Sequence, residues 1–394
     1  MSGAVIVSGA RTPIGKLGSS LSCVPAVELG ARVIAEALRR ASISPNQVDY
    51  VALGQVLQAG QGQNPARQAA VLAGVPMTVQ AVTVNKVCLS GLASIHLADL
   101  LIGSGEADIV VAGGMESMSG APYYVAGARR GLGFGDTAMR DVVLSDGLTD
   151  AFSGAAMGAA TDRDAAEASI GRDDQDAVAL RSHQRAAAAT KDGHFAEEII
   201  SVAVPQRRGD DVVVRDDEGI RGDTSKAALA ALKPAFEPTG TITAGNASQI
   251  SDGAAAVVVM SRRAAERLGT QPLAEIVSFG RAAGPGTSLL TQPSRAIVDA
   301  LGRSRLGLAD LDVIEVNEAF AAVVVASAGD LGVPVEDLNP NGGAIALGHP
   351  IGMSGARLPL TLALELRRRG GGIGAAALCG GGGLGDAVIV RAVP

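Results

Sequence analysis

One histidine of this 394-residue chain lies in a segment that suits chemistry better than packing. His349 belongs to residues 339–355, NPNGGAIALGHPIGMSG, whose five glycines free the backbone for positive φ and for close approach to a ligand. Pro350 follows directly and disfavours helical φ and ψ at His349. A helical pattern begins near Ser354, so the histidine is predicted in a loop just before a helix. Loops held by regular elements commonly carry catalytic groups.

A first cysteine lies at a similar junction. Cys88 follows an apolar strand expected at residues 81–84 and precedes a helix expected from Ser90 to about Ser104. Backbone N–H groups and the helix dipole at such a position favour a thiolate, which would make Cys88 a nucleophile. A free cysteine that only packs in the core is an equally good interpretation of this environment.

A second cysteine, Cys379, ends the apolar strand GIGAAAL and opens a run of four glycines at residues 380–383. Four successive glycines add nothing to a core, but their N–H groups can face a ligand and form an oxyanion hole. Asn317 follows the apolar strand DVIEV, and by itself it is best interpreted as a helix cap. Two thiols and one histidine in glycine-rich loops together suggest acyl transfer through a thioester.

The remaining histidines and the third cysteine have ordinary surroundings. His96, His183 and His194 fall in or beside amphipathic helical patterns, and we interpret them as surface or boundary residues. Cys23 lies in a turn before a helix and is interpreted as structural. Three cysteines far apart predict no disulfide framework, and the absence of CxxC or Cys/His ligand spacing predicts no metal site.

Composition excludes several classes of protein. A net charge of −7 and a pI near 5.2 provide no general attraction for nucleic acid or an anionic membrane. The N-terminal residues do not resemble a signal peptide, and we expect no apolar run that approaches the ~18 residues of a spanning helix. We therefore expect a cytoplasmic protein with no nucleic-acid or membrane partner.

Strand and helix patterns alternate along the chain, which predicts a parallel or mixed sheet covered on both faces. The alternation breaks between residues 115 and 245, where turns, charged helices and an exposed hairpin indicate an inserted loop domain. The C-terminal part then repeats the N-terminal elements in the same order; SGARLPLTLALELRRR, for example, corresponds to SGLASIHLADLLIGSG. Two similar α/β halves are predicted.

Several long motifs resemble the thiolase family, in the same order and over essentially the whole chain. They are NKVCLSGL, GGMESMSGAPY, TAGNASQISDGAAA, NEAFA, NPNGGAIALGHPIGMSGAR and ALCGGGGLGD. The resemblance implies the thiolase fold: two βαβαβαββ halves in a five-layer α/β/α/β/α core. It places residues 1–117 and 246–269 in the N-terminal half, 118–245 in a loop domain for coenzyme A and oligomer contacts, and 270–394 in the C-terminal half.

The resemblance also implies roles for the residues singled out above. Cys88 would take up the acyl group, and His349 would activate it. His349, with Asn317 acting through a water, would also donate to the thioester oxygen. Cys379 would move a proton on and off the substrate Cα, and the N–H groups of Cys88 and Gly381 would form a second oxyanion hole.

Coenzyme A contacts are implied at four further positions, Arg221, Ser248, Met157 and Phe320, the last two at the acyl end. Coenzyme A and acetyl-CoA would be substrates, with no tightly bound cofactor, and a homotetramer is expected. The chain departs from the pattern of many biosynthetic members at Ala156, where His is frequent, at Gln249, where Gly is common, at Leu89, where a small residue is usual, and at residues 284–293. These departures concern the preference for acyl-chain length.

The resemblance thus leads to an acetyl-CoA acetyltransferase that condenses two acetyl-CoA to acetoacetyl-CoA and CoA. A degradative 3-ketoacyl-CoA thiolase for longer chains is the alternative within the family. A decarboxylating ketoacyl synthase normally has one Cys and two His, and this sequence has no second His in a suitable glycine-rich loop. A non-catalytic CoA-binding protein is disfavoured by the intact Cys88, Cys379 and His349.

Overall fold

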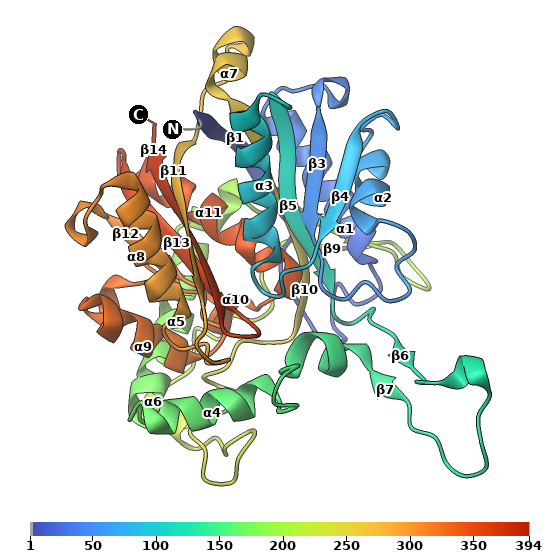
Figure 1. Cartoon of the computed structure of the whole chain (residues 1–394), viewed down its shortest axis with the longest axis vertical. Coiled ribbons are helices and arrows are strands. Elements are labelled where there is room, and N and C mark those ends of the chain that lie inside the picture. Colours follow the sequence, from blue (N-terminus) through green and yellow to red (C-terminus); the bar gives the residue numbers. More distant parts are fainter. Residues whose placement is uncertain (1–2, 394) are drawn as a thin grey trace.

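A computed structural model describes residues 3–393, and its centre is a mixed β-sheet built from two similar halves (Figure 1). The N-terminal half has the order β4 (Gln80–Val84), β3 (Tyr50–Gly54), β5 (Ile109–Ser117), β10 (Ser251–Ser261) and β1 (Ala4–Arg11). The C-terminal half has the order β12 (Val313–Val316), β13 (Gly372–Gly380), β14 (Leu384–Ala392) and β11 (Ala274–Ala283). In both halves the strand that comes last in the chain, β10 or β14, lies antiparallel to its two neighbours.

The two halves differ at one strand and meet along one edge. The strand that would correspond to β4 is reduced in the C-terminal half to a single bridge between Ile314 and Leu338, so the expected strand count is one too high there. Strands β1 and β11 pair over two residues, Val5 with Glu275 and Ile6 with Ala274. This short pairing joins both halves into one continuous sheet.

Alternating burial along the strands creates the layers. In β10, Ala254, Ala256 and Val258 pack with α1 (Ala26–Arg40) and α2 (Pro65–Leu72), whereas the intervening residues pack with α3 (Ser90–Ser104) and α11 (Ile351–Arg368). In the C-terminal half one face of β13 and β14 packs with α8 (Gln292–Ser304) and α9 (Ala321–Leu331) and the other with the central helices. Since side chains alternate across a strand, each half of the sheet is covered on both faces, with α3 and α11 between the halves. The expected five-layer core is confirmed.

Glycines let the two central helices cross closely near their N-termini. A Cβ on Gly91 of α3 would lie 2.6 Å from the backbone N of Ala356, and one on Gly355 of α11 would lie 2.4 Å from the N of Leu92. Strand β5 approaches α11 as closely, because a Cβ on Gly114 would lie 1.9 Å from the carbonyl oxygen of Gly352. Larger residues would push the helices apart. The crossing places the starts of both helices beside each other.

The segment between β5 and β10 forms the insertion. Its hairpin of β6 and β7 extends away from the core in Figure 1, and a π-helical turn, Val143–Leu148, follows it. The expected exposed hairpin is confirmed as β8 and β9, which pair antiparallel. The segment contains β6 (Tyr123–Tyr124), β7 (Arg140–Asp141), α4 (Met157–Glu167), α5 (Arg172–Lys191), β8 (Val202–Val204), β9 (Val212–Val214) and α6 (Lys226–Ala230).

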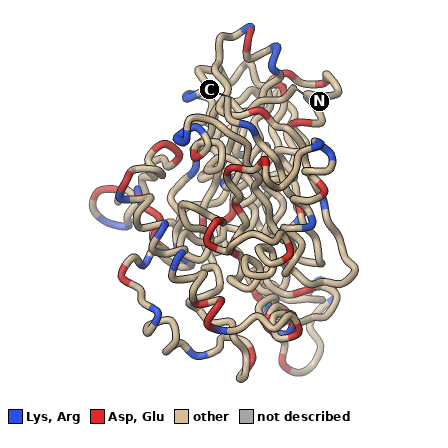
Figure 2. The backbone as a smooth tube through the Cα atoms, turned by 90° about the vertical axis from the view of Figure 1, so that its left-hand side faces the viewer, with Lys and Arg blue, Asp and Glu red and all other residues tan. Residues whose placement is uncertain are grey.

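Short elements complete the chain. Strand β2 (Gly15–Lys16) pairs with β10, and helix α7 (Arg262–Leu268) follows β10. Helix α10 (Ala344–Leu347) is a single turn that ends just before His349. Figure 2 shows basic and acidic positions interspersed in this view, in keeping with a chain that has both charges and a modest net negative sum.

Four expectations about local structure are wrong. Ser22, whose type and place before the first long helix suggest an N-cap, does not cap α1; its hydroxyl donates to Ser19 O, and Pro25 occupies the cap position. His183 is buried, because the insertion folds over its helix. Cys23 is exposed and has no packing role. The stretch Val87–Ser104 is 18 residues long with a mean hydropathy of 1.6, so an apolar run of that length does exist. It contains α3, which packs against α11, β3 and β5, but less than half of the stretch is buried.

Candidate active site

The loop that carries Cys88 holds an unusual backbone conformation. Val87 has φ of +51°, a sterically unfavourable region for a β-branched residue. Asn85 Oδ1 accepts the N–H of Val87 at 3.1 Å, and Ser90 Oγ donates to the carbonyl of Val87 at 2.6 Å. Lys86 binds Asp386 of β14 through its Nζ at 2.6 Å. These bonds over-determine the strained turn and fix Cys88 at the start of α3.

The position of Cys88 before a helix led us to expect a thiolate, but its surroundings raise the pKa of the thiol and favour the protonated form. Burial raises the pKa of the Cys88 thiol to about 12, and the charge of nearby Glu116 acts in the same direction. Two backbone N–H groups, of Cys88 itself and of Gly381, interact with the sulfur and only partly offset burial. Cys88 is half-buried and packs against an apolar cluster formed by Val56, Leu57, Met118, Val142, Val143 and Ile351. Cys88 is therefore a neutral thiol at rest and requires a base.

Cys379 and Gly381 reach this sulfur from the end of β13. Cys379 is fully buried, and burial followed by the charge of Cys88 raises the pKa of its thiol. Gly381 faces the Cys88 loop, since a Cβ there would lie 3.4 Å from Val87 Cγ1. Gly382 and Gly383 have φ of +80° and +69°, so the glycine run provides the turn that brings the Gly381 N–H to the sulfur.

Hydrogen bonds around His349 define which ring nitrogen is free. Nδ1 lies 2.6 Å from Ser354 Oγ, and the Ser354 hydroxyl donates to the carbonyl of Pro350 at 3.0 Å. Because the Ser354 proton is used there, Nδ1 carries the ring proton and donates to Ser354. Nε2 keeps its lone pair and lies 3.5 Å from Asn317 Nδ2. Burial, helped by the charge of Arg357, lowers the pKa of His349 to about 4. The imidazole is thus a neutral base at neutral pH.

Asn317 is not the helix cap that its position alone suggested. Helix α9 begins at Ala321 with Phe320 at the cap position, whereas the Asn317 N–H donates to Ala377 O of β13 at 2.9 Å. The side chain is buried, and its Oδ1 has no hydrogen-bond partner within residues 3–393. A buried polar atom of this kind calls for a water or a ligand. The structure therefore brings Asn317 and His349 together with an open polar position.

Two buried carboxylates support the site and were missed by reasoning from the sequence. Glu116 accepts the N–H groups of Val56 at 3.0 Å, Leu57 at 3.1 Å and Gly352 at 2.9 Å, and burial raises its pKa to about 7. Glu318 accepts from Ser182 Oγ, Asn339 Nδ2 and the N–H of Ile345. Glu116 lies near the end of an apolar strand in the motif GGMESMSG, and Glu318 follows an apolar strand in the motif NEAFA. An acidic residue at such a position was the signal in the sequence that could have identified them.

The expected coenzyme contacts fall into two places. Met157 begins α4 and Phe320 precedes α9; both pack at the margin of one apolar cluster, where the ring of Phe320 meets Phe236 edge-on at 6.4 Å. Ser248 lies beside this pair, since its N–H donates to Ala319 O at 3.0 Å. Arg221 lies elsewhere, with an exposed side chain and its N–H donating to His183 Nδ1 at 3.1 Å.

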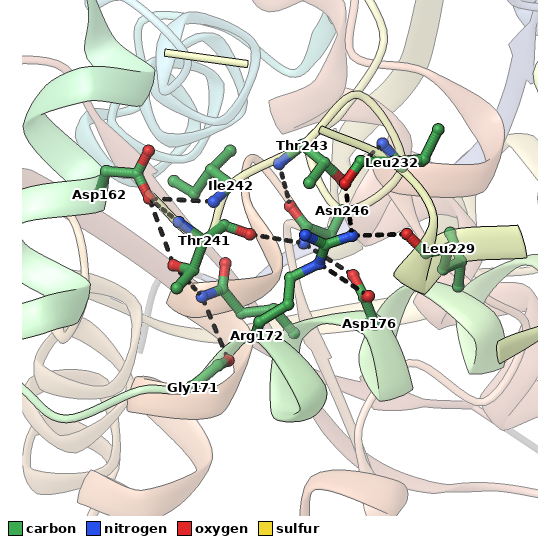
Figure 3. Close-up of polar contacts among 12 residues, drawn as sticks. Asp162, Gly171, Arg172, Asp176, Leu229, Leu232, Thr241, Ile242, Thr243 and Asn246 are labelled. Carbon is green, nitrogen blue, oxygen red and sulfur yellow. Dashed lines mark hydrogen bonds and ion pairs between the residues drawn. The ribbon is translucent and has the colours of Figure 1, made fainter. Parts of the chain in front are cut away.

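A polar network in the insertion fixes the segment before Ser248 (Figure 3). Asp162 Oδ1 accepts the N–H groups of Thr241 at 2.8 Å and Ile242 at 2.9 Å. Asn246 Nδ2 donates to Asp176 Oδ1 at 2.9 Å, and Arg172 binds the other oxygen of Asp176 at 2.8 Å. Buried groups bonded in this way have little freedom, so residues 241–246 form a fixed base for the residues that follow.

Comparison with known proteins agrees with this arrangement. Residues 4–263 match the family model described as thiolase, N-terminal domain, and residues 270–392 match thiolase, C-terminal domain. A probable acetyl-CoA acetyltransferase of Mycobacterium leprae (strain TN) is 55% identical over 393 residues, with 100% of both chains covered. An acetyl-CoA acetyltransferase of Chromobacterium violaceum is 49% identical over 386 residues, with 98% of each covered.

A solved structure shows the same architecture. The crystal structure of the Bacillus anthracis acetyl-CoA acetyltransferase superposes with a TM-score of 0.97 at 40% sequence identity, and 99% of each chain is covered. Two family models together span nearly the whole chain, and the relatives are covered end to end. The chain is therefore a member of the thiolase family and an acyltransferase enzyme.

Proposed function

We propose that this thiolase catalyses the reversible condensation of two acetyl-CoA to acetoacetyl-CoA and CoA. The observation that carries the proposal is a neutral Cys88 thiol that is faced by two N–H groups and packs against the apolar cluster containing Ile351, two residues after a His349 whose Nε2 is unprotonated. The names of the relatives, acetyl-CoA acetyltransferases, support the choice of substrate.

In the first step His349 Nε2 takes the proton of Cys88, and the sulfur attacks the thioester carbonyl. The N–H groups of Cys88 and Gly381 stabilise the oxyanion, because fixed dipoles in a site with little water need no reorganisation. The carbon–sulfur bond to coenzyme A then breaks, and the leaving thiolate takes the proton of the Cys379 thiol, so that Cys379 becomes a thiolate and His349 keeps its proton on Nε2. Acetyl-Cys88 and free CoA result.

In the second step the Cys379 thiolate removes a proton from the methyl group of a second acetyl-CoA. The enolate oxygen is stabilised by Asn317 and by the proton that His349 now carries on Nε2, beside the open polar position at Asn317 Oδ1. The enolate carbon attacks acetyl-Cys88, the bond to its sulfur breaks, and the Cys88 thiolate takes the proton back from His349, so that Cys88, Cys379 and His349 all return to their neutral forms. A buried thiolate with a raised pKa is a strong base, which this deprotonation requires.

We further propose that Arg221, Ser248, Met157 and Phe320 contact coenzyme A, with the apolar pair at the acyl end. Assembly into a homo-oligomer, a tetramer by our expectation, is supported by exposed apolar residues on neighbouring elements. Leu72, Met77 and Leu100 are 63%, 65% and 56% exposed around the unpaired edge of β4, and Phe134 is exposed on the β6–β7 hairpin. Contiguous apolar surface and a free strand edge both favour a protein partner.

CoA-dependent cleavage of 3-ketoacyl-CoA substrates of increasing length tests the function, with Cys88→Ala as the blank. We expect kcat/KM to be highest on acetoacetyl-CoA and to fall with length. A rise with length would move the enzyme to the degradative class for longer chains. Full turnover by Cys88→Ala, or no acetyl adduct on Cys88 in mass spectra after acetyl-CoA treatment, would contradict the covalent mechanism.

A further inference from the structure

The side chain of Gln249 lies between two loops that the proposed function uses. Its Nε2 is within hydrogen-bond distance of the carbonyl oxygens of Gly219 at 3.2 Å, Ile345 at 3.1 Å and Ala346 at 3.4 Å. Gly219 is two residues from Arg221, and the other two carbonyls belong to α10, the turn that leads into His349. One amide group therefore bonds to residues 219–221, called the coenzyme loop below, and to residues 344–349, called the His349 loop.

Helix α10 ends with carbonyls that its own backbone cannot satisfy. In a continued helix the His349 N–H would donate to the carbonyl of Ile345. It donates instead to Gln249 O at 3.1 Å. The next position is Pro350, which has no N–H for Ala346 O. The Gln249 amide supplies the missing donor to both carbonyls. Gln249 thus replaces the helical bonds whose loss allows the chain to turn and His349 to enter the site.

The backbone on the other side of Gln249 holds the same peptide. Ser251 Oγ donates to Gln249 O at 2.7 Å and lies 3.3 Å from the His349 N. The segment before Gln249 is fixed by the network of Figure 3 and by the Ser248 N–H bond to Ala319 O. His349 is therefore positioned by a residue that is itself rigidly placed.

The coenzyme loop packs directly on this junction. A Cβ on Gly219 would lie 2.2 Å from Ala346 O and 2.6 Å from Gln249 Nε2. The two residues before Gly219 are anchored to the N-terminal half, because Asp217 accepts the N–H of Ile14 and Glu218 accepts that of Lys16, each at 2.8 Å. Any movement of residues 219–221 must therefore act on Gln249 and on α10.

We propose that Gln249 is a positioning residue that joins the coenzyme loop to the His349 loop, so that coenzyme binding and the placement of the catalytic base depend on one side-chain amide. The inference rests on the proposed function for the coenzyme contact at Arg221. The bonds to α10 do not depend on it. Removing the donors should misplace His349 relative to Cys88 and loosen residues 219–221 together.

The test compares Gln249→Met, which keeps the length and removes the donors, with Gln206→Met. Gln206 also donates from Nε2 to a carbonyl, that of Val204 at 3.1 Å in the β8–β9 hairpin, and serves as the matched control. Alkylation of Cys88 by iodoacetamide is followed by mass spectrometry from pH 6 to 9 in a Cys23→Ser background. KM for CoA in thiolysis and the melting temperature are measured on the same proteins.

For Gln249→Met we expect alkylation of Cys88 at neutral pH to slow by about tenfold, the effect of one lost hydrogen bond to a fixed base, with a rise in KM for CoA. Gln206→Met should match the wild type. Gln249→Glu, which keeps the shape but replaces the donor by an acceptor, should show the same losses and serves if the Met protein does not fold.

Folded Gln249 variants with wild-type alkylation profiles and wild-type KM would overturn the proposal, even if their melting temperatures fall. Alkylation needs no substrate. A wild-type protein without thiolysis would therefore count against the proposed function, while the alkylation series would still decide the role of Gln249.

Discussion

The carboxylate of Glu116 accepts the N–H of Gly352 at 2.9 Å, although Glu116 lies in a strand of the first half and Gly352 lies in the first turn of α11 in the second half. A carboxylate at a helix N-terminus is favoured by the unpaired N–H groups and the helix dipole. The same carboxylate holds the loop at Val56 and Leu57, which packs near Cys88. One buried side chain therefore fixes the nucleophile side and the histidine side of the site together.

Glu116→Gln should lower the free energy of unfolding by about 1–3 kcal/mol, because an amide has one acceptor oxygen and would turn an NH₂ group toward N–H donors. The kcat of the folded variant should also fall, since the Gly352 N–H that Glu116 holds belongs to α11, which begins two residues after His349. Urea unfolding and kcat on the same preparations check this. Gln58→Glu, a change at a surface loop whose side chain donates only to Gln55 O, provides a comparison. Wild-type kcat in a destabilised Glu116→Gln protein would contradict a link to the site.

Ser354→Ala should reduce kcat by about tenfold to hundredfold, part of the effect of a general base, because His349 loses the acceptor that fixes its proton on Nδ1. The measurement is kcat and KM in thiolysis. Ser94→Ala is the matched control, since Ser94 is also buried in a central helix and bonds a carbonyl one turn earlier, that of Ser90, at 3.0 Å. Equal effects of the two substitutions would remove the special role of Ser354.

Three buried or half-buried histidines contribute stability that should be lost as the pH drops from about 6.5 to about 4. Burial lowers the pKa values of His96, His183 and His349 to about 4, whereas an unfolded histidine titrates near 6.5. The unfolded state therefore binds more protons in this window, and linkage favours it as protons are added. Urea midpoints at successive pH values measure the slope. His183→Gln should reduce the slope, and an unchanged slope would contradict the assignment.

The catalytic rate should keep its acid limb near pH 4, because His349 must be neutral to accept the Cys88 proton and its pKa is lowered to about 4. The rate should then stay level through the neutral range, because Cys88 passes its proton to His349 inside the site and burial keeps both Cys88 and Cys379 protonated at rest. A profile of kcat/KM from pH 4 to 10 tests the acid limb and the level range. A half-maximal rate near pH 6.5 on the acid side would show a histidine with an ordinary pKa.

Arg11→Met should destabilise the fold by about 3–5 kcal/mol, because it leaves two buried carboxylates without their cation. Arg11 binds Glu198 at 2.6 Å and Asp217 at 2.7 Å, and all three side chains are buried. Thermal and urea unfolding measure the loss. Arg39→Met, which breaks an exposed pair with Glu36, should change stability little. Similar losses in both variants would contradict the importance of burial.

Local features of the fold could be predicted from the sequence because their causes lie within a few residues. Asn64 caps α2 before Pro65 as its type and position suggest, with Oδ1 accepting the N–H of Arg67. The repeated order of strands and helices followed from apolar patterning, which the sheet order of both halves confirms. The Ser22 cap failed because a nearer competitor, Ser19 O, takes the hydroxyl and Pro25 is already suited to precede a helix.

The protonation states of Cys88 and His349 depend on tertiary packing. The position of Cys88 before a helix is a local property and favours a thiolate, but the apolar residues that raise its pKa come from four distant segments of the chain. The sequence by itself determined which residue types were present and the elements that carry them. Only the crossing of α3 and α11 through their glycines brought Cys88, Gly381 and the partners of His349 together. Desolvation and long-range contacts depend on the whole fold, and they fixed the protons on Cys88 and His349 and the roles of Glu116 and Gln249.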